Sequence, residues 1–313
     1  MRPIEIMLLL ANLLTFIALA FPLPGAVSWM RQSALIALLI AFAQVLVEGV
    51  RWQMVPAYVL TGLFFLVCLH KNIATAGGLV KQKKKRTHRL AFGLVVIVSA
   101  LGLMVSSVLP IIMPVFSFPP PSGPYEIGTL TYHWVDDARA EVFTTDPNDR
   151  RELMAQIWYP AKGNSSSRRA PYVQDADVLA TAQARLHNLP EFTLSHFRYV
   201  TTNAIPSAPM ADNVPSHPVL IFLEGLTGYR QMNTFQVQEL VSHGYIVVAI
   251  DQPYAAAEVV FPDGRQVAGL SKDQIDVLIQ QSVSPIEKTP ILNRQSFKMG
   301  IIPYFAQDVI SSI

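Results

Sequence analysis

The chain has 313 residues, of which 51% are hydrophobic and only 15% are charged. Charged residues usually make up about a quarter of a soluble protein, so this composition argues against a wholly soluble chain and places part of it in lipid. The net charge of +2 excludes nothing by itself, because most of the basic surplus lies in one short run, but the single cysteine, Cys68, excludes an intrachain disulfide.

The apolar excess lies before Phe116, in four runs at residues 4–23, 34–50, 54–69 and 90–116. A bilayer-spanning helix needs about 20 apolar residues. The first and fourth runs qualify, whereas the second and third are shorter, and we interpret them as a tight hairpin of spans. The sequence therefore predicts an N-terminal α-helical transmembrane region of about four helices, residues 1–117. A cleaved signal peptide is the alternative for the first run, and the three further runs argue against it. We expect Glu48 to lie near the interface and to pair with Arg51.

A basic run, "KQKKKRTHR" at residues 81–89, separates the third and fourth apolar runs. Read alone, it could be a nucleic-acid patch. Between two spans it is typical of a cytoplasmic loop that follows the positive-inside rule, so we expect no nucleic-acid partner. The fourth span then places everything after it outside the cytoplasm, in an integral, multi-pass protein of the cell membrane. "FPPPSGP", residues 118–124, is predicted to be a proline-rich linker.

Residues 125–313 read as a globular α/β domain. "GTLTYHWVDD" and "ELMAQIWYP" alternate as an antiparallel pair of strands, and a helix is predicted over residues 175–187. "VVFPDGRQV" predicts a hairpin, and the last residues predict a helix that is cut off.

A βαβ unit lies within this domain. "HPVLIFLEG" predicts a strand covered on both faces, and "YIVVAIDQP" predicts its parallel neighbour. The helix between them is expected to start with a capping box of Asn233 and Gln236, to end at Gly244, and to bury four apolar residues, which are Phe235, Val237, Leu240 and Val241.

The loop after the first strand of this unit is the candidate binding site. Ligands bind at the carboxyl ends of parallel strands, and Gly225 and Gly228 allow backbone amides to turn toward a ligand. Such amides stabilise a developing negative charge, so the candidate loop is Gly225, Leu226, Thr227 and Gly228. The alternative is a tight turn without chemistry. Asp251 either lines the site or shapes the turn into Gln252 and Pro253.

Three blocks, "GPYEIGTLTYHWVDDAR", "RELMAQIWYPA" and the segment from "HPVLIF" to "DQPY", together resemble the platelet-activating-factor acetylhydrolase family over about residues 123–313. The resemblance implies an α/β-hydrolase, without metal or cofactor, that cleaves short or oxidised acyl chains from phospholipids; some bacterial relatives are carboxylic ester hydrolases. It implies membrane lipid and an ester or phospholipid-like substrate as partners. By position, the Leu226 N–H would be an oxyanion donor. Glu224 stands where the family usually has histidine, and its charge would oppose the transition state unless it turns away or is neutralised.

The serine elbow that such a hydrolase needs, G-x-S-x-G, is absent from this sequence; "GLSKD" and "VSHGY" do not fit it. The resemblance puts the nucleophile, acid and base after the last helix, so we expect only the first half of the domain here and the triad beyond Ile313. None of the seven histidines is expected to be the base, because five precede the elbow position and two lie in the membrane half; they are His133, His187, His196, His217, His243, His70 and His88.

Two functions therefore compete. The first is a membrane-anchored carboxylic ester hydrolase, active on short acyl esters in lipid degradation, of which this chain is a fragment. The second is a non-catalytic membrane protein whose degenerate hydrolase module binds lipid or a partner. A transporter is disfavoured, because four spans with little intramembrane polarity supply no obvious path.

Overall fold

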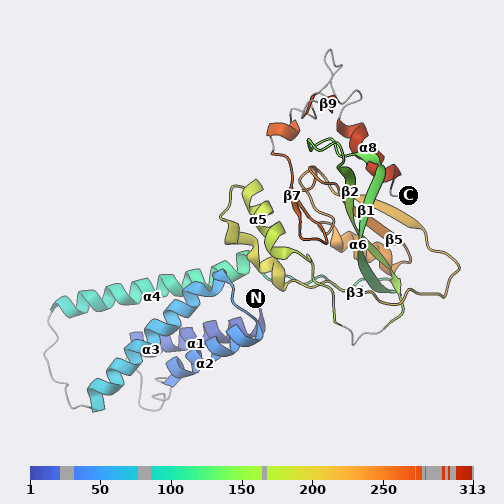
Figure 1. The fold of residues 1–313 in the computed structure, drawn as a ribbon. Helices are drawn as coiled ribbons and strands as arrows, with labels where there is room; N and C mark the ends of the chain where they lie inside the picture. The colour runs from blue at the N-terminus through green and yellow to red at the C-terminus, as the bar shows by residue number, and fades with distance from the viewer. Residues whose placement is uncertain are drawn as a thin grey trace. The chain divides into compact units, whose positions relative to one another are not determined.

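A computed structural model describes residues 1–21, 32–76, 86–163, 168–271, 273–276, 279, 291–292, 295–296 and 301–311. The chain forms two compact units, residues 1–115 and 116–313 (Figure 1). Residues 81–85 of the basic run and Lys272 of "GLSKD" lie outside the described residues.

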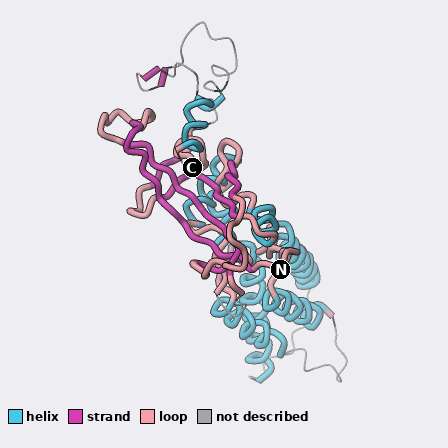
Figure 2. The backbone as a smooth tube through the Cα atoms, turned by 90° about the vertical axis from the view of Figure 1, so that its right-hand side faces the viewer, coloured by secondary structure: helices cyan, strands magenta, loops and turns pink. Residues whose placement is uncertain are grey.

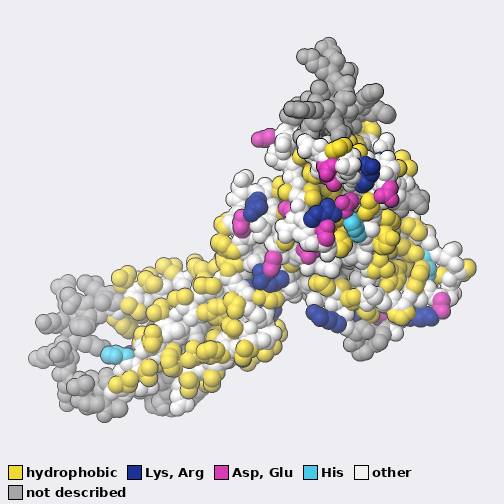
Figure 3. Space-filling model, viewed as in Figure 1, with side chains coloured by type: hydrophobic (Ala, Val, Ile, Leu, Met, Phe, Trp, Pro, Cys, Tyr) yellow, Lys and Arg dark blue, Asp and Glu magenta, His cyan; other side chains and the backbone are white. Residues whose placement is uncertain are grey.

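The first unit is helical. Its helices are α1 (Pro3–Ala20), α2 (Ser33–Val47), α3 (Val55–Ala76) and α4 (Arg86–Ile112), with a short 3-10 turn, η2 (Trp52–Met54). Three described segments are long and apolar enough to cross a membrane: Pro3–Ala20, Trp52–Ile73 and Phe92–Ile112. Apolar side chains cover the visible surface of this unit (Figure 3). Helix α2 has 15 residues and is shorter than a usual span, so a fourth span stays a prediction.

The interior of the helical unit is more polar than the sequence suggested. Small residues such as Ala11, Ala37 and Ala57 are buried where the helices meet, as expected for close packing in lipid. Between them, Asn12 Nδ2 donates to Thr61 Oγ1 at 2.9 Å, and two further hydroxyls, of Thr15 and Ser33, lie 2.9 Å apart. These polar groups satisfy one another and hold the helices together.

The expected pair of Glu48 with Arg51 is wrong. Arg51 is buried and donates to both carboxylate oxygens of Glu5 at 2.7 Å, and to the Met113 carbonyl at 2.9 Å. Glu48 instead lies 3.6 Å from Arg2 and accepts from the Ile4 N–H at 2.9 Å. Glu5 was the nearer partner in space, because helix α1 brings its first turn beside η2.

The second unit contains a mixed five-stranded sheet in the order β3-β1-β2-β5-β4. Figure 2 shows its strands running side by side as one twisted sheet. The main strands are β1 (Glu126–Ala140), β2 (Arg150–Ala161), β3 (Ile205–Pro206), β4 (Val219–Leu223) and β5 (Ile246–Asp251). The other elements are α5 (Ala176–Leu186), η3 (Glu191–Tyr199), α6 (Thr234–Ser242), β6 (Glu258–Val260), β7 (Gln266–Ala268), β8 (Ile291–Leu292), β9 (Gln295–Ser296) and α8 (Ile301–Ile310).

The principal predicted elements of this unit are confirmed. Strands β1 and β2 are antiparallel, β4 and β5 are parallel and joined by α6, and β6 and β7 form the predicted hairpin. Helix α6 buries Val237 and Val241 against Ile127, Trp158 and Val247 of the sheet. This packing makes one face of the sheet the main core.

The predicted linker packs against the second unit. The ring of Phe118 lies 5.3 Å from that of Tyr172, and the Pro119 carbonyl accepts from Asn203 Nδ2 at 2.9 Å. These contacts fix the path by which the chain enters β1.

Three local predictions are wrong. Strand β4 is not covered on both faces, because Val219 and Leu223, which share one face, are 58% and 49% exposed. It is also the outermost strand of the described sheet. Phe235 is 55% exposed rather than buried. The side chain of Asn233 does not cap α6; the helix continues from a preceding turn, in which the Thr234 N–H donates to the Gln231 carbonyl at 3.1 Å.

The face of the sheet opposite α6 carries exposed apolar side chains. The strand register places Ile221 of β4, Ile157 of β2 and Leu130 of β1 in one row across this face, through Val248 of β5. Alternation then puts Tyr132, Val219 and Leu223 on the same face, where all three are exposed. An apolar sheet face is normally covered by another layer.

Candidate active site

The candidate loop, Glu224 to Gly228, leaves the carboxyl end of β4 beside the carboxyl end of β5. It closes as a tight turn, in which the Gly228 N–H donates to the Gly225 carbonyl at 2.8 Å. Thr227 has a φ of 63°, a left-handed conformation that is unusual for a β-branched residue. Its N–H donates to the Ala255 carbonyl at 2.7 Å, which ties the loop to the segment after β5.

Helix α5 and the segment after β5 hold this loop from two sides. Gln183 of α5 donates through Nε2 to the Thr227 carbonyl at 3.0 Å. The Ala257 N–H donates to the Gly228 carbonyl at 2.9 Å. A Cβ on Gly228 would lie 2.7 Å from the Gly225 carbonyl oxygen and 3.0 Å from the Glu224 Cβ. Only glycine therefore fits at position 228 without shifting the backbone.

The backbone N–H groups of the loop differ in whether they already donate a hydrogen bond within the protein. The Thr227 and Gly228 N–H groups are already bound inside the protein, so Gly228 does not direct its amide toward a ligand as expected. Among the described residues, the Leu226 N–H has no acceptor, and Leu226 itself is exposed. The amide that the family resemblance selects as oxyanion donor is thus free to donate a hydrogen bond to an oxyanion.

Two carboxyl groups lie behind the loop with a single arginine. Asp251, at the end of β5, is 2% exposed. It accepts from the Arg230 backbone N–H at 2.5 Å and pairs with the Arg230 guanidinium. Asp251 therefore anchors Arg230, rather than the turn into Pro253 that the sequence suggested. Glu224 is half-buried, and among the described residues its buried Oε2 has no hydrogen-bond partner.

The carboxyl groups differ electrostatically. Burial raises the pKa of Glu224 well above the usual value for glutamate, and the negative charge of Asp251 raises it further. Burial also raises the pKa of Asp251, while the charge and hydrogen bonds of Arg230 act against this rise. A cavity of about 20 Å³, lined in part by Tyr229, Arg230 and Asp251, borders the ion pair of Asp251 with Arg230. A cavity of this size holds about one water molecule.

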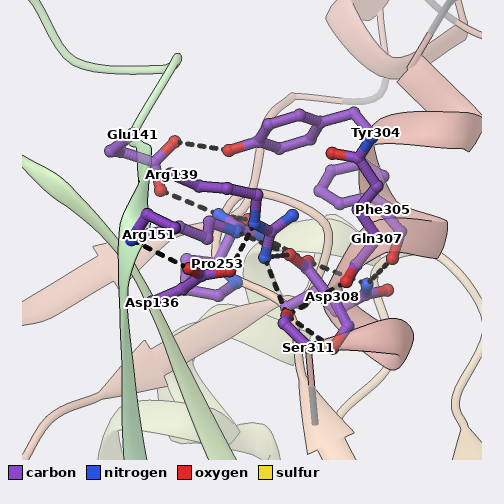
Figure 4. Close-up of polar contacts among 12 residues, drawn as sticks. Asp136, Arg139, Glu141, Arg151, Pro253, Tyr304, Phe305, Gln307, Asp308 and Ser311 are labelled. Atoms are coloured by element: carbon purple, nitrogen blue, oxygen red, sulfur yellow. Dashed lines mark hydrogen bonds and ion pairs between the residues drawn. The ribbon is translucent and has the colours of Figure 1, made fainter.

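A buried ion-pair cluster fastens helix α8 to the same edge of the sheet (Figure 4). Arg151 of β2 donates to Asp308 of α8 at 3.1 and 2.7 Å, and to Glu141 at 2.8 Å. Arg139 donates to Asp308 at 2.6 Å, and Gln252 donates to it at 2.9 Å. Burial disfavours the charge on Arg151, but the hydrogen bonds and charge of Asp308 outweigh this and raise its pKa.

One serine, one histidine and one glutamate also meet on the surface. Ser122 Oγ lies 3.1 Å from His243 Nε2, and Glu239 Oε1 lies 3.2 Å from the same nitrogen. In a catalytic triad the acid binds the other ring nitrogen and so orients the base. Here the Ser122 hydroxyl donates to Glu239 itself, so this group is a surface hydrogen-bond cluster and not a nucleophile with its base.

Comparison with known proteins identifies the family. A sequence model described as "Platelet-activating factor acetylhydrolase, isoform II" matches residues 111–295, more than half of the chain. The chain belongs to this family. The match confirms the resemblance read from the sequence blocks and supports a carboxylic ester hydrolase in general terms.

Among solved structures, the chain is similar to a ferulic acid esterase from Streptomyces cinnamoneus, with 26% sequence identity and a TM-score of 0.42. The similarity covers 55% of this chain and 51% of that esterase. The chain thus spans about half the length of the esterase that it matches. No curated protein matches the chain.

Proposed function

We propose that this chain is the membrane-anchored first part of a serine carboxylic ester hydrolase that cleaves short acyl esters of phospholipid-like substrates. The observation that carries the proposal is the Leu226 N–H, which has no acceptor among the described residues and lies at the carboxyl edge of the sheet in an acetylhydrolase-family domain. In such an enzyme a serine oxygen adds to the ester carbonyl. This amide and a second one beside the serine then stabilise the oxyanion.

The serine, acid and base are supplied, in this proposal, by residues beyond Ile313. Strand β4 supports this, because it forms the outer edge of the described sheet. Its side chains Val219 and Leu223 continue the exposed apolar face that Leu130 and Tyr132 begin. A further strand pairing with β4, followed by a helix on this face, would cover both and would place its own carboxyl end beside the Leu226 amide.

The membrane unit anchors the hydrolase, in this proposal, with the domain outside the cytoplasm. The support is the basic run at residues 81–89 between two apolar segments, together with three helices of spanning length. Reporter fusions after Arg89 and after Gly123 test the orientation. The first should report a cytoplasmic position and the second an external one, and a cytoplasmic signal from both would rule the orientation out.

Activity tests the function directly. The 313-residue chain should neither hydrolyse short-chain esters measurably nor be labelled by a serine-directed phosphonate, because covalent acyl transfer needs an activated nucleophile. A version extended through the adjoining coding sequence should do both, with a preference for short acyl chains. Specific labelling of the 313-residue chain would show that a nucleophile lies within it. An adjoining sequence without G-x-S-x-G would favour the alternative of a degenerate module that binds lipid or a partner.

A further inference from the structure

The group behind the candidate loop has one positive charge for two carboxyl groups. Arg230 is buried and uses its backbone N–H and its guanidinium on Asp251. Asp251, almost fully buried, needs this partner, because an isolated buried carboxylate is very unfavourable. The pair of Asp251 and Arg230 is therefore neutral without Glu224, although the buried Arg230 Nε has no hydrogen-bond partner among the described residues.

Glu224 is held in this environment by the loop itself. Its Cβ and Cγ pack so closely against Gly228 that a Cβ there would lie 3.0 Å from each. Its Oε2 is buried and, within the described residues, accepts no hydrogen bond. Burial and the negative charge of Asp251 raise the pKa of Glu224, and they outweigh the opposing effects of its own backbone N–H and of Arg230, which is paired with Asp251.

An ionised Glu224 would therefore leave a net negative charge in a buried cluster with one unsolvated oxygen. Burying a carboxylate without a counter-ion or hydrogen bonds costs far more than burying the neutral acid. A neutral carboxyl also has an O–H to donate, which a carboxylate lacks. Next to a developing oxyanion, the two forms have opposite effects, because a negative charge opposes it and a neutral donor does not.

We propose that Glu224 keeps its proton at neutral pH because its Oε2 is buried without a partner and Asp251 holds Arg230, so that no second negative charge lies behind the loop that carries the Leu226 amide. The protonation concerns the 313-residue chain by itself. Its role at an ester carbonyl rests on the proposed function.

Infrared spectroscopy of the 313-residue chain in detergent, with ¹³C-labelled glutamate, tests the protonation. Wild-type protein at pH 7 should show the carbonyl band of a protonated glutamate, and E224Q should lack it. E258Q is the matched control, because burial also raises the pKa of the half-buried Glu258; it should retain the band that E224Q loses. Absence of the band from wild-type protein, or its persistence in E224Q, would overturn the proposal.

The pH dependence of unfolding gives a second readout. A carboxyl whose pKa is higher in the folded chain stabilises the fold fully below its unfolded pKa, and this contribution is lost as the pH rises through the folded pKa. Relative to E224Q, the folding equilibrium constant of wild-type protein should fall by up to about tenfold per pH unit above the ordinary glutamate pKa. Parallel pH profiles for the two proteins would overturn the proposal.

A third variant keeps the proposal testable if E224Q does not fold. D251N frees the Arg230 guanidinium for Glu224, so the protonated band should disappear at a lower pH than in wild-type protein. If the band of the protonated glutamate titrates at the same pH in D251N as in wild-type protein, the proposal is overturned. The pairing of Arg230 with Asp251 would then not be the reason that Glu224 keeps its proton. Ester hydrolysis is not measured in any of these experiments, so their failure is distinct from a failure of the proposed esterase.

Discussion

Two buried arginines at the carboxyl edge of the sheet, Arg151 and Arg230, are surrounded very differently. Arg151 shares one of its two carboxylate partners, Asp308, with a second arginine, Arg139. Each oxygen of Asp308 there accepts two hydrogen bonds. Arg230 faces two carboxyl groups alone, and an oxygen of one of them, Glu224, has no partner among the described residues.

This difference separates a cluster that only stabilises the fold from one that contains a carboxyl group with a perturbed pKa. Where every carboxylate oxygen is bound and each carboxylate has an arginine partner, the cluster holds elements together. Where a buried carboxyl lacks a counter-ion, its proton is retained and its pKa moves toward neutrality. Perturbed groups of the second kind gather at functional sites, and this one lies behind the loop that the sequence predicts to bind the ligand.

The largest expected effect comes from breaking the complete cluster with D308N. This change leaves Arg151 buried with a weaker partner and loosens α8, so it should destabilise the second unit by about 3–5 kcal/mol. The free energy of unfolding from chemical denaturation measures it. D263N is the control, because Asp263 forms an exposed pair with Arg265 and should leave stability unchanged. Equal effects of the two variants would mean that the Arg151 cluster is not a structural clamp.

Local sequence patterns predicted much of this fold. The alternation in "ELMAQIWYP", the apolar run of β5 and Gly244 at the end of α6 are all short-range signals, and the structure agrees with each. Exposure of β4 was mispredicted, because an apolar run shows that a strand can be covered, not that a neighbour is present. Phe235 was assigned to the core from helical spacing alone, whereas only Val237 and Val241 among the apolar residues of this helix are buried against the sheet.

The charged clusters could not be predicted either, because they join residues that lie far apart in the sequence. Arg151 and Asp308 are 157 residues apart, and nothing in either local pattern indicates that they meet. Glu5 and Arg51, 46 residues apart, were likewise missed, and Arg51 was assigned to the nearest acid in sequence, Glu48. The loop itself was predicted, since its position follows from the strand that precedes it, whereas the electrostatics of Glu224 depend on Asp251 of a different strand.

A smaller loss of stability is expected from D251N in the incomplete cluster. It removes the counter-ion of Arg230, but the charge of Arg230 also acts on Glu224, which we expect to take over as counter-ion. The cost should therefore be about 1–3 kcal/mol rather than the larger value for D308N. The cost should also shrink as the pH rises, because Glu224 in the variant then ionises toward Arg230. Denaturation at pH 5 and pH 8 measures both. A cost as large as that of D308N, and equal at both pH values, would show that Glu224 does not compensate.

A modest gain is expected from relaxing the backbone of the loop with T227G. An L-residue in the left-handed region is strained by about 1–2 kcal/mol, and the added freedom of glycine in the unfolded chain offsets part of the relief. We therefore expect the free energy of unfolding of the second unit to increase by about 0.5–1 kcal/mol. T201G is the matched control, since Thr201 is not among the residues with positive φ, and it should lose stability. If T227G destabilises as T201G does, the loop is not strained at this position.

The smallest effect should come from E224H in the extended, active enzyme. If Glu224 were ionised, replacing it with the family's usual histidine would remove a negative charge beside the oxyanion and raise turnover by tenfold or more, since each factor of ten corresponds to about 1.4 kcal/mol of transition-state energy. A protonated Glu224 removes that penalty beforehand, so turnover at pH 7 should change by no more than a few-fold. The measurement is kcat across pH for the wild type and E224H.

The ratio of the two kcat values should stay near one at neutral pH. It should favour the histidine variant only where the pH is high enough to ionise Glu224. A large gain already at pH 7 would show that the carboxylate is charged there, and that Arg230 does not distinguish the two acids as the geometry indicates.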